Sequence, residues 1–165
     1  MKYTVGIITL SDKGALGLRE DKSGPAIREM LEADGHFQME EQILLSDDRE
    51  VLEKELVRLA DEEKLNLILT TGGTGLSPRD NAPEATLAVA DRQVPGIAEY
   101  MRAKSIEITP KAMLSRGASV IRRQTLIINL PGSPKAVREN LGFIMPVISH
   151  GLDIMLELDG ECGSN

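Results

Sequence analysis

The sequence contains few of the residues that build disulfides, zinc centres or aromatic binding surfaces. It has one cysteine, Cys162, two histidines and no tryptophan, and aromatic residues make up 2% of the chain. A lone cysteine has no partner for a disulfide, and no Cys/His cluster has the spacing of a zinc site. Scarce aromatic side chains leave no stacking platform for single strands. Redox, structural-zinc and base-stacking roles are therefore excluded.

The chain has no excess of positive charge and no long apolar run. The net charge is −7, whereas nucleic-acid binding relies on Lys and Arg spread over a broad surface, so we expect no nucleic-acid partner. A polyanionic ligand would have to bind in a local pocket. No apolar run could cross a membrane, and the first residues show no signal-peptide cleavage site, so we expect a cytoplasmic protein.

The length and the order of apolar segments predict one domain over residues 1–158, followed by a flexible tail over 159–165. We expect strands over 3–10, 37–45, 65–71, 118–121 and 126–130. Helices are expected over 25–33, 51–63, 83–91, part of 97–106, and 134–149, the last interrupted or kinked near Pro146. Strand-helix alternation predicts a three-layer α/β fold, a mostly parallel sheet with helices on both faces.

Four loops follow expected strands, and ligands of open parallel sheets bind where such loops gather. These loops are Ser11-Asp12, Ser46-Asp47, residues 72–80 and Pro131-Gly132-Ser133. We therefore expect them to form one shared site.

The glycine loop Gly72-Gly73-Thr74-Gly75 follows an apolar strand. Backbone N–H groups of such a loop can converge on a phosphate, although a tight strand-to-helix turn explains the glycines equally well. The loop lacks the Gly-Lys-Ser/Thr of a P-loop and the third glycine of the dinucleotide-binding pattern. It is neither of those two motifs.

Three loops supply an aspartate, namely Asp12, Asp47 and Asp80. Such carboxylates could hold Mg²⁺, which prefers one or two of them together with substrate phosphate oxygens. Helix capping is an equal alternative for Asp47. For the Arg79-Asp80 pair the alternative is a surface salt bridge.

Further anion-binding groups come from Ser115-Arg116-Gly117 and from residues 130–135, where a helix begins. Turn chemistry is the alternative, and it is stronger for the prolines than for Arg116. His36 and His150 lie in an expected turn and at an expected helix end, where we expect structural or solvated side chains, and no Ser/His/Asp arrangement supports covalent acyl chemistry.

Together, GIITLSD, the DKSGPA stretch from Asp21, TTGGTGLSPRDNAPEAT, LSRG and LIINLPGSP resemble the molybdopterin-binding MogA/MoaB family over nearly the whole chain. The resemblance implies an α/β fold assembled as a homotrimer. It also implies transfer of AMP from ATP to the terminal phosphate of molybdopterin, with Mg²⁺ as cofactor and release of pyrophosphate. The adenylylated product would pass to a molybdate-inserting partner enzyme.

By motif position, the resemblance assigns catalysis and Mg²⁺ binding to Asp47 and Asp80. Substrate binding is assigned to Ser11, Asp12, Gly72, Gly73, Thr74, Gly75, Arg79, Ser115, Arg116, Pro131, Gly132 and Ser133. Two alternatives stay open: a non-catalytic molybdopterin-binding or carrier module, and a purely structural trimer subunit.

One position departs from the family pattern. The helix that Pro83 begins is preceded by Ala82, where the family usually has threonine, and alanine cannot cap a helix. We expect Asp80 or Asn81 to take over part of the capping.

Overall fold

The computed structural model describes residues 1–158, so the predicted tail and Cys162 lie outside the described residues. One six-stranded sheet has the order β2-β1-β3-β6-β5-β4. The strands are β1 (Tyr3–Leu10), β2 (Phe37–Leu45), β3 (Leu67–Thr71), β4 (Arg92–Gln93), β5 (Ser119–Arg122) and β6 (Thr125–Leu130). The α-helices are α1 (Asp12–Ala15), α2 (Ser23–Asp34), α3 (Arg49–Val57), α4 (Ala82–Ala88), α5 (Pro95–Ile108) and α6 (Pro134–Met155).

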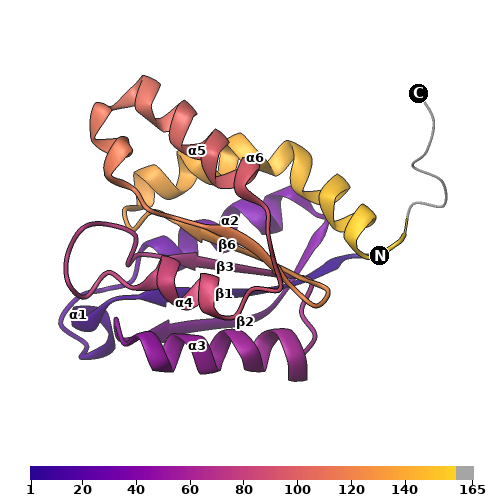
Figure 1. Cartoon of the computed structure of the whole chain (residues 1–165), viewed down its shortest axis with the longest axis horizontal. Helices are drawn as coiled ribbons and strands as arrows, with labels where there is room; N and C mark the ends of the chain where they lie inside the picture. The colour runs from indigo at the N-terminus through magenta and orange to yellow at the C-terminus, as the bar shows by residue number, and fades with distance from the viewer. Residues whose placement is uncertain (159–165) are drawn as a thin grey trace.

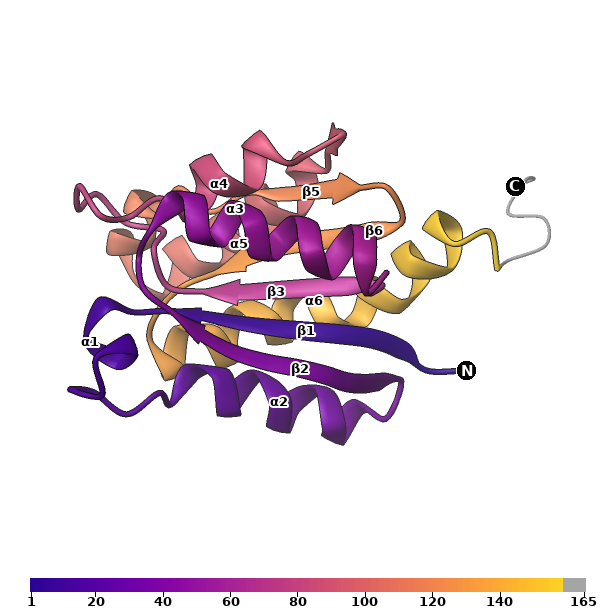
Figure 2. The same ribbon diagram turned by 90° about the horizontal axis from the view of Figure 1, so that it is seen from below.

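The four neighbouring strands β2, β1, β3 and β6 run parallel, and β5 and β4 continue the sheet antiparallel. Figure 2 shows the parallel strands side by side, with the short helix α1 near the end at which their arrowheads lie. The predicted α/β class with a mostly parallel sheet is confirmed. The loops that follow β1, β2, β3 and β6 consequently meet along one edge.

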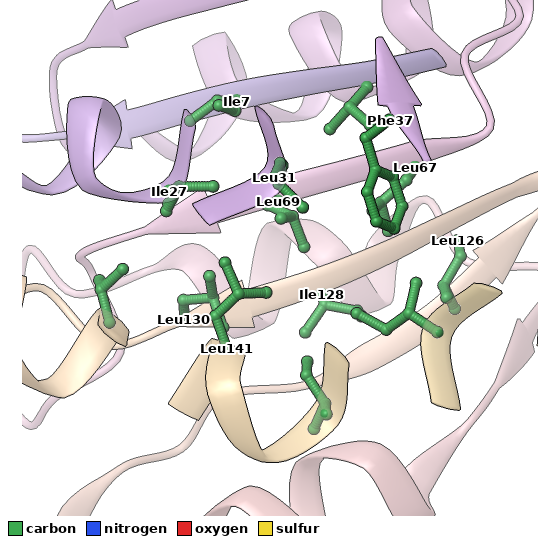
Figure 3. Close-up of a cluster of buried hydrophobic side chains, with 14 of the residues drawn as sticks. Ile7, Ile27, Leu31, Phe37, Leu67, Leu69, Leu126, Ile128, Leu130 and Leu141 are labelled. Carbon is green, nitrogen blue, oxygen red and sulfur yellow. The ribbon is translucent and has the colours of Figure 1, made fainter. Parts of the chain in front are cut away.

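Burial on both faces explains the apolar runs in the central strands. Every residue of β3 and β6 is buried, whereas the edge strand β2 alternates between more and less exposed positions. On one face, Leu67 and Leu69 pack with Ile27 of α2 and Leu141 of α6 (Figure 3). On the opposite face α3 and α4 cover the sheet, and Figure 1 shows them across the sheet from α2, α5 and α6.

The last helix differs from its prediction, because α6 is one continuous helix that passes Pro146 and ends at Met155. Proline removes one hydrogen bond of the helix and disturbs the preceding turn. Beyond it, Ile148 and Leu152 are buried in the core, and this packing favours continuation of the helix. None of the helices in the described part of the chain is long and apolar enough to cross a membrane.

Three short elements were not predicted: α1, β4 and a 3₁₀ helix over Pro110–Leu114. The predicted helix over 51–63 is α3, which begins at Arg49 and continues as a π-helical turn over Arg58–Glu62. Elements of two to five residues carry too few apolar positions to show a period. For β4, the strand forms because Arg92 and Gln93 pair with β5, which comes much later in the chain.

A partly buried ion pair joins the π-helical turn to β5, and its removal should destabilise the fold. Arg122 donates to Asp61 from Nε and Nη2 at 3.0 and 2.7 Å, which lowers the pKa of this carboxyl from its ordinary 3.8. A lowered pKa stabilises the fold above pH 3.8, and this contribution disappears as the pH falls through the lowered value. At pH 7 we expect Asp61→Asn to lower the free energy of unfolding, measured with urea, by about 2 kcal/mol.

The difference between parent and Asp61→Asn should shrink below about pH 4. Glu32→Gln is the matched control, because the pair of Glu32 with Arg28 is exposed and lies within one helix. It should change the unfolding free energy by less than about 0.5 kcal/mol. A cost of Asp61→Asn that does not depend on pH would contradict the charge-pair explanation.

Candidate active site

Two pockets lie beside the glycine loop at the carboxyl edge of the sheet. The larger, of about 780 Å³, contains Asp47 and Asp80, and we call it the carboxylate pocket. The smaller, of about 300 Å³, contains Met101 of α5, and we call it the α5 pocket. Residues 72 and 73 line the first and residues 74 and 75 the second, so the glycine loop forms part of the wall of both.

The carboxylate pocket collects half of the predicted site residues. Those that line it are Ser11, Asp47, Gly72, Gly73, Asp80, Gly132 and Ser133. Four charged residues that were not predicted also line it, Arg19, Glu20, Asp21 and Lys22. The α5 pocket takes the predicted Thr74, Gly75, Ser115 and Pro131, together with Arg102, Ser105, Lys111, Glu139 and Asn140, which were not predicted. Among the described residues, the predicted Asp12, Arg79 and Arg116 line neither pocket.

The glycine at position 72 is required by both conformation and space. Gly72 has φ +92°, and a Cβ built there would lie 2.5 Å from the carbonyl oxygen of Leu10. Its N–H donates to Leu130 O at 3.3 Å. Because this N–H is already used, the first glycine closes β3 against β6 and does not leave its amide for an anion.

Asp47 and Asp12 join the loops after β2 and β1. The Asp12 N–H donates to Asp47 Oδ2, and the Asp47 N–H donates to Asp12 Oδ1, both at 2.9 Å. Asp48, not Asp47, is the N-cap of α3, with Oδ1 accepting from Val51 N. The capping alternative for Asp47 is therefore wrong, and its carboxylate faces the loop of Asp12.

The charges around these carboxylates shift their pKa values in opposite directions. The pKa of Asp12 is lowered, chiefly by its hydrogen bonds with Arg79, whose Nε and Nη2 donate at 2.9 and 2.8 Å. The pKa of Asp47 is raised, first by burial and further by the negative charges of Asp12 and Asp80. Asp47 and Asp80 are thus close enough to repel each other, and a cation between them would relieve that repulsion.

Asp47 and Asp80 fit a Mg²⁺ ion that takes its other ligands from water and phosphate. Each of the two carboxylates accepts a backbone hydrogen bond through Oδ2, and Oδ1 makes no hydrogen bond within the described residues. No group of three or more His, Cys, Asp or Glu in residues 1–158 is arranged to hold a metal. Asp12 is bound to Arg79, so the trio considered from the sequence is reduced to two carboxylates, a number that suits Mg²⁺ beside a phosphorylated substrate.

Two predicted hydroxyl groups serve as helix caps. Ser11 Oγ accepts from Gly14 N at 2.9 Å and caps α1, and Ser133 Oγ accepts from Ala136 N at 3.2 Å and caps α6. The prediction that the side chain of Asp80 or Asn81 caps α4 is wrong. Asn81 occupies the N-cap position but its side chain makes no capping hydrogen bond, and Asp80 Oδ2 accepts from Ser77 N instead. Asp80 is consequently not committed to that helix.

The DKSGPA stretch ties the first loop to the last, although no role was assigned to it. Asp21 Oδ1 accepts from Ser23 N and Gly24 N at 3.1 and 3.0 Å, and its Oδ2 accepts from Thr9 Oγ1 at 2.8 Å. Ser23 Oγ donates to Gly132 O at 2.8 Å. The sequence signal for these contacts is an aspartate just before the expected helix, because aspartate often accepts hydrogen bonds from the first backbone N–H groups of a helix.

Comparison with known proteins agrees with this geometry. The family model described as "Probable molybdopterin binding domain" matches residues 6–150. The chain belongs to this molybdopterin-binding family. It is 43% identical over 154 residues to an Escherichia coli K12 protein named molybdopterin adenylyltransferase, and the match covers 90% of this chain and 78% of that one. The family predicted from the loop motifs is thereby confirmed.

Solved structures of family members have the same fold. The molybdopterin biosynthesis enzyme MoaB from Thermus thermophilus is 50% identical, with a TM-score of 0.89 over 94% of this chain and 97% of that chain. A MoaB from Pyrococcus furiosus, described as a tungsten cofactor synthesizing protein, is 34% identical with a TM-score of 0.82, over 93% and 97% of the two chains. The family's role in molybdenum cofactor biosynthesis therefore extends to this chain.

Proposed function

We propose that this protein transfers AMP from Mg-ATP to the terminal phosphate of molybdopterin and releases pyrophosphate. The observation that carries the proposal is the pair of pockets that share the glycine loop as a wall. A transfer between two ligands requires two adjoining sites whose reacting ends meet. The loop after β6 is divided in the same way, with Pro131 in the α5 pocket and Gly132 and Ser133 in the carboxylate pocket.

The carboxylate pocket suits the nucleotide. Asp47 and Asp80 provide carboxylate ligands for Mg²⁺, and Arg19 and Lys22 provide positive charge for the triphosphate. Ser133 places the N-terminus of the long helix α6 at the same pocket, and helix N-termini attract phosphate. These local charges explain how a chain of net charge −7 could admit ATP.

The α5 pocket suits molybdopterin, which combines a flat heterocycle with a terminal phosphate. Apolar walls come from Met101 and Leu114, and amide and carboxylate groups for ring nitrogens come from Asn140 and Glu139. A cation and hydroxyls for the phosphate come from Lys111, Thr74 and Ser115. Thr74 belongs to the shared wall, so a phosphate beside it would lie next to the carboxylate pocket.

In this reaction an oxygen of the terminal molybdopterin phosphate bonds to the α-phosphorus of ATP, and the bond from that phosphorus to the bridging oxygen breaks as pyrophosphate leaves. No covalent bond to the protein is needed. The protein holds the two phosphates in line, excludes water and places positive charge at the leaving group. Mg²⁺ would neutralise charge on the transferred and leaving phosphates when bound.

The remaining sequence predictions complete the proposal: a cytoplasmic homotrimer that passes its adenylylated product to a molybdate-inserting partner enzyme. A carrier that binds molybdopterin without turnover is the second candidate, because the α5 pocket alone would support binding. The free Oδ1 atoms of Asp47 and Asp80, which accept no hydrogen bond from the described residues, favour the enzyme, since a carrier needs no cation site there.

The test mixes the full chain with molybdopterin, Mg²⁺ and ATP, and follows pyrophosphate and adenylylated pterin together. We expect the two products to appear in equal amounts. Pterin binding without pyrophosphate release would support the carrier, and neither binding nor release would support a structural subunit.

The division between the pockets predicts a selective effect of Lys22→Ala. Lys22 lines the carboxylate pocket and is exposed, so its removal should spare the fold. We expect the KM for Mg-ATP to rise about fivefold to tenfold, because one phosphate contact is lost, while the Kd for molybdopterin is unchanged. Lys2→Ala, at the opposite end of β1, is the control. Equal weakening of both ligands would contradict the assignment of the pockets.

A further inference from the structure

Within the described residues, Arg116 lines neither pocket, and its side chain binds the loop that carries Asp80. Its Nε donates to Gly75 O at 2.8 Å, and its Nη2 donates to Asp80 O at 2.7 Å. Nη1 pairs with the carboxylate of Glu84 in α4. All three nitrogens of the guanidinium therefore bind protein acceptors.

These bonds hold both ends of the loop from Gly75 to Asp80. The residues between them are exposed, and Leu76 has 65% of its surface accessible, so the loop has no apolar anchor of its own. The Arg116 N–H adds a hydrogen bond to Thr74 O at 2.9 Å. Side chain and backbone of one residue thus connect the shared wall of the two pockets to the backbone of Asp80.

Glu84 keeps the arginine in this orientation. Burial acts to raise the pKa of Glu84, but hydrogen bonding with Arg116 and the nearby positive charges leave it below its ordinary value, so the carboxylate is ionised at neutral pH. Neither Glu84 nor Arg116 lines either of the two pockets among the described residues. The pair is placed to order a loop, not to touch a ligand.

We propose that Arg116, oriented by Glu84, is a positioning residue that holds the Gly75–Asp80 loop so that the Asp80 carboxylate lies at the transferred phosphate. This role replaces the substrate contact expected for Arg116 from the sequence, and it rests on the proposed adenylyl transfer. A planar guanidinium can reach three acceptors at once, whereas an ammonium group cannot reproduce that fork. The loop should therefore depend on arginine and not merely on positive charge.

The test compares Arg116→Ala, Arg116→Lys and Glu84→Gln with the parent. We expect both arginine variants to lose about a hundredfold in kcat, since a displacement of about 1 Å near the reacting groups has that effect. The Kd values for molybdopterin and Mg-ATP should stay within about twofold. Glu84→Gln retains an acceptor for Arg116 and should keep most of the activity. Arg138→Ala is the control, because Arg138 pairs with exposed Glu29 on helices outside the loop.

Hydrogen exchange supplies a second measurement that does not depend on turnover. Amides 76–82 should exchange on the order of tenfold faster in Arg116→Lys, with the core strands unchanged. If Arg116→Lys keeps full activity, the inference fails. If ligand Kd values rise about tenfold while loop exchange is unaltered, Arg116 is a substrate contact and the inference also fails. If the parent shows no turnover, the adenylyl-transfer proposal fails, and loop exchange still decides whether Arg116 orders the loop. If the Arg116→Ala chain does not fold, Arg116→Lys decides by its kcat and its loop exchange.

Discussion

Replacement of Asp47 or Asp80 by asparagine should abolish most adenylyl transfer and leave the fold intact. Each side chain keeps its size and can still accept the one backbone hydrogen bond that it makes, from Asp12 N or from Ser77 N. The lost charge is the one that would hold Mg²⁺ at the transferred phosphate. We expect kcat to fall at least about a hundredfold to a thousandfold in each variant, as when a charge-stabilising group is removed.

Molybdopterin binding should be unchanged in both variants, because the carboxylates line the other pocket. Asp48→Asn is the matched control: it alters the adjacent aspartate, which caps α3, and asparagine caps a helix equally well. Full turnover in Asp47→Asn or Asp80→Asn would show that the replaced carboxylate is not required for catalysis. An equal loss in Asp48→Asn would show that the effect comes from the general charge of this loop.

Replacement of Gly72 by alanine should destabilise the fold and disable both pockets together. Gly72 has φ +92°, a left-handed conformation. The Cβ of an alanine there would lie only 2.5 Å from the backbone carbonyl oxygen of Leu10. Left-handed conformation costs an alanine about 1–2 kcal/mol, and the clash adds a shift of β1 or β3. We expect the free energy of unfolding, measured with urea, to fall by about 3 kcal/mol or more. The protein that remains folded should have lost its turnover.

Gly35→Ala separates these two costs. Gly35 has φ +87° at the end of α2, and a Cβ there would meet no atom of the described residues within 4 Å. It should lose only the conformational part, about 1–2 kcal/mol, and keep full turnover. If the two variants were equally stable, the close approach of Gly72 to β1 would not contribute, and the packing of the glycine loop against Leu10 would need another explanation.

Much of the fold could be predicted because its signals are local. The apolar runs of β1, β3 and β6 are buried on both faces, and runs of that kind predict central parallel strands. Errors arose where local signals are weak or are overridden. Pro146 predicts a break, yet the burial of Ile148 and Leu152 favours one helix past it.

The loops of the site were also predictable, because they follow strands of a parallel sheet and carry glycine, aspartate and serine. Which function each side chain serves was not. Asp47 and Asp48 are adjacent and equally good caps in sequence, and only the reciprocal bonds with Asp12 separate their roles.

The α/β class, the family and the four loops at one sheet edge could be predicted from residue type, spacing and strand order. The division of the loops between two pockets, and the contacts of Arg116 with Gly75, Asp80 and Glu84, became visible only in the folded structure. The reason is that those contacts join residues 32 to 41 positions apart. Residues so far apart in the sequence come together only when β3 and β6 pair. A local sequence pattern therefore cannot predict which acceptor the arginine will bind.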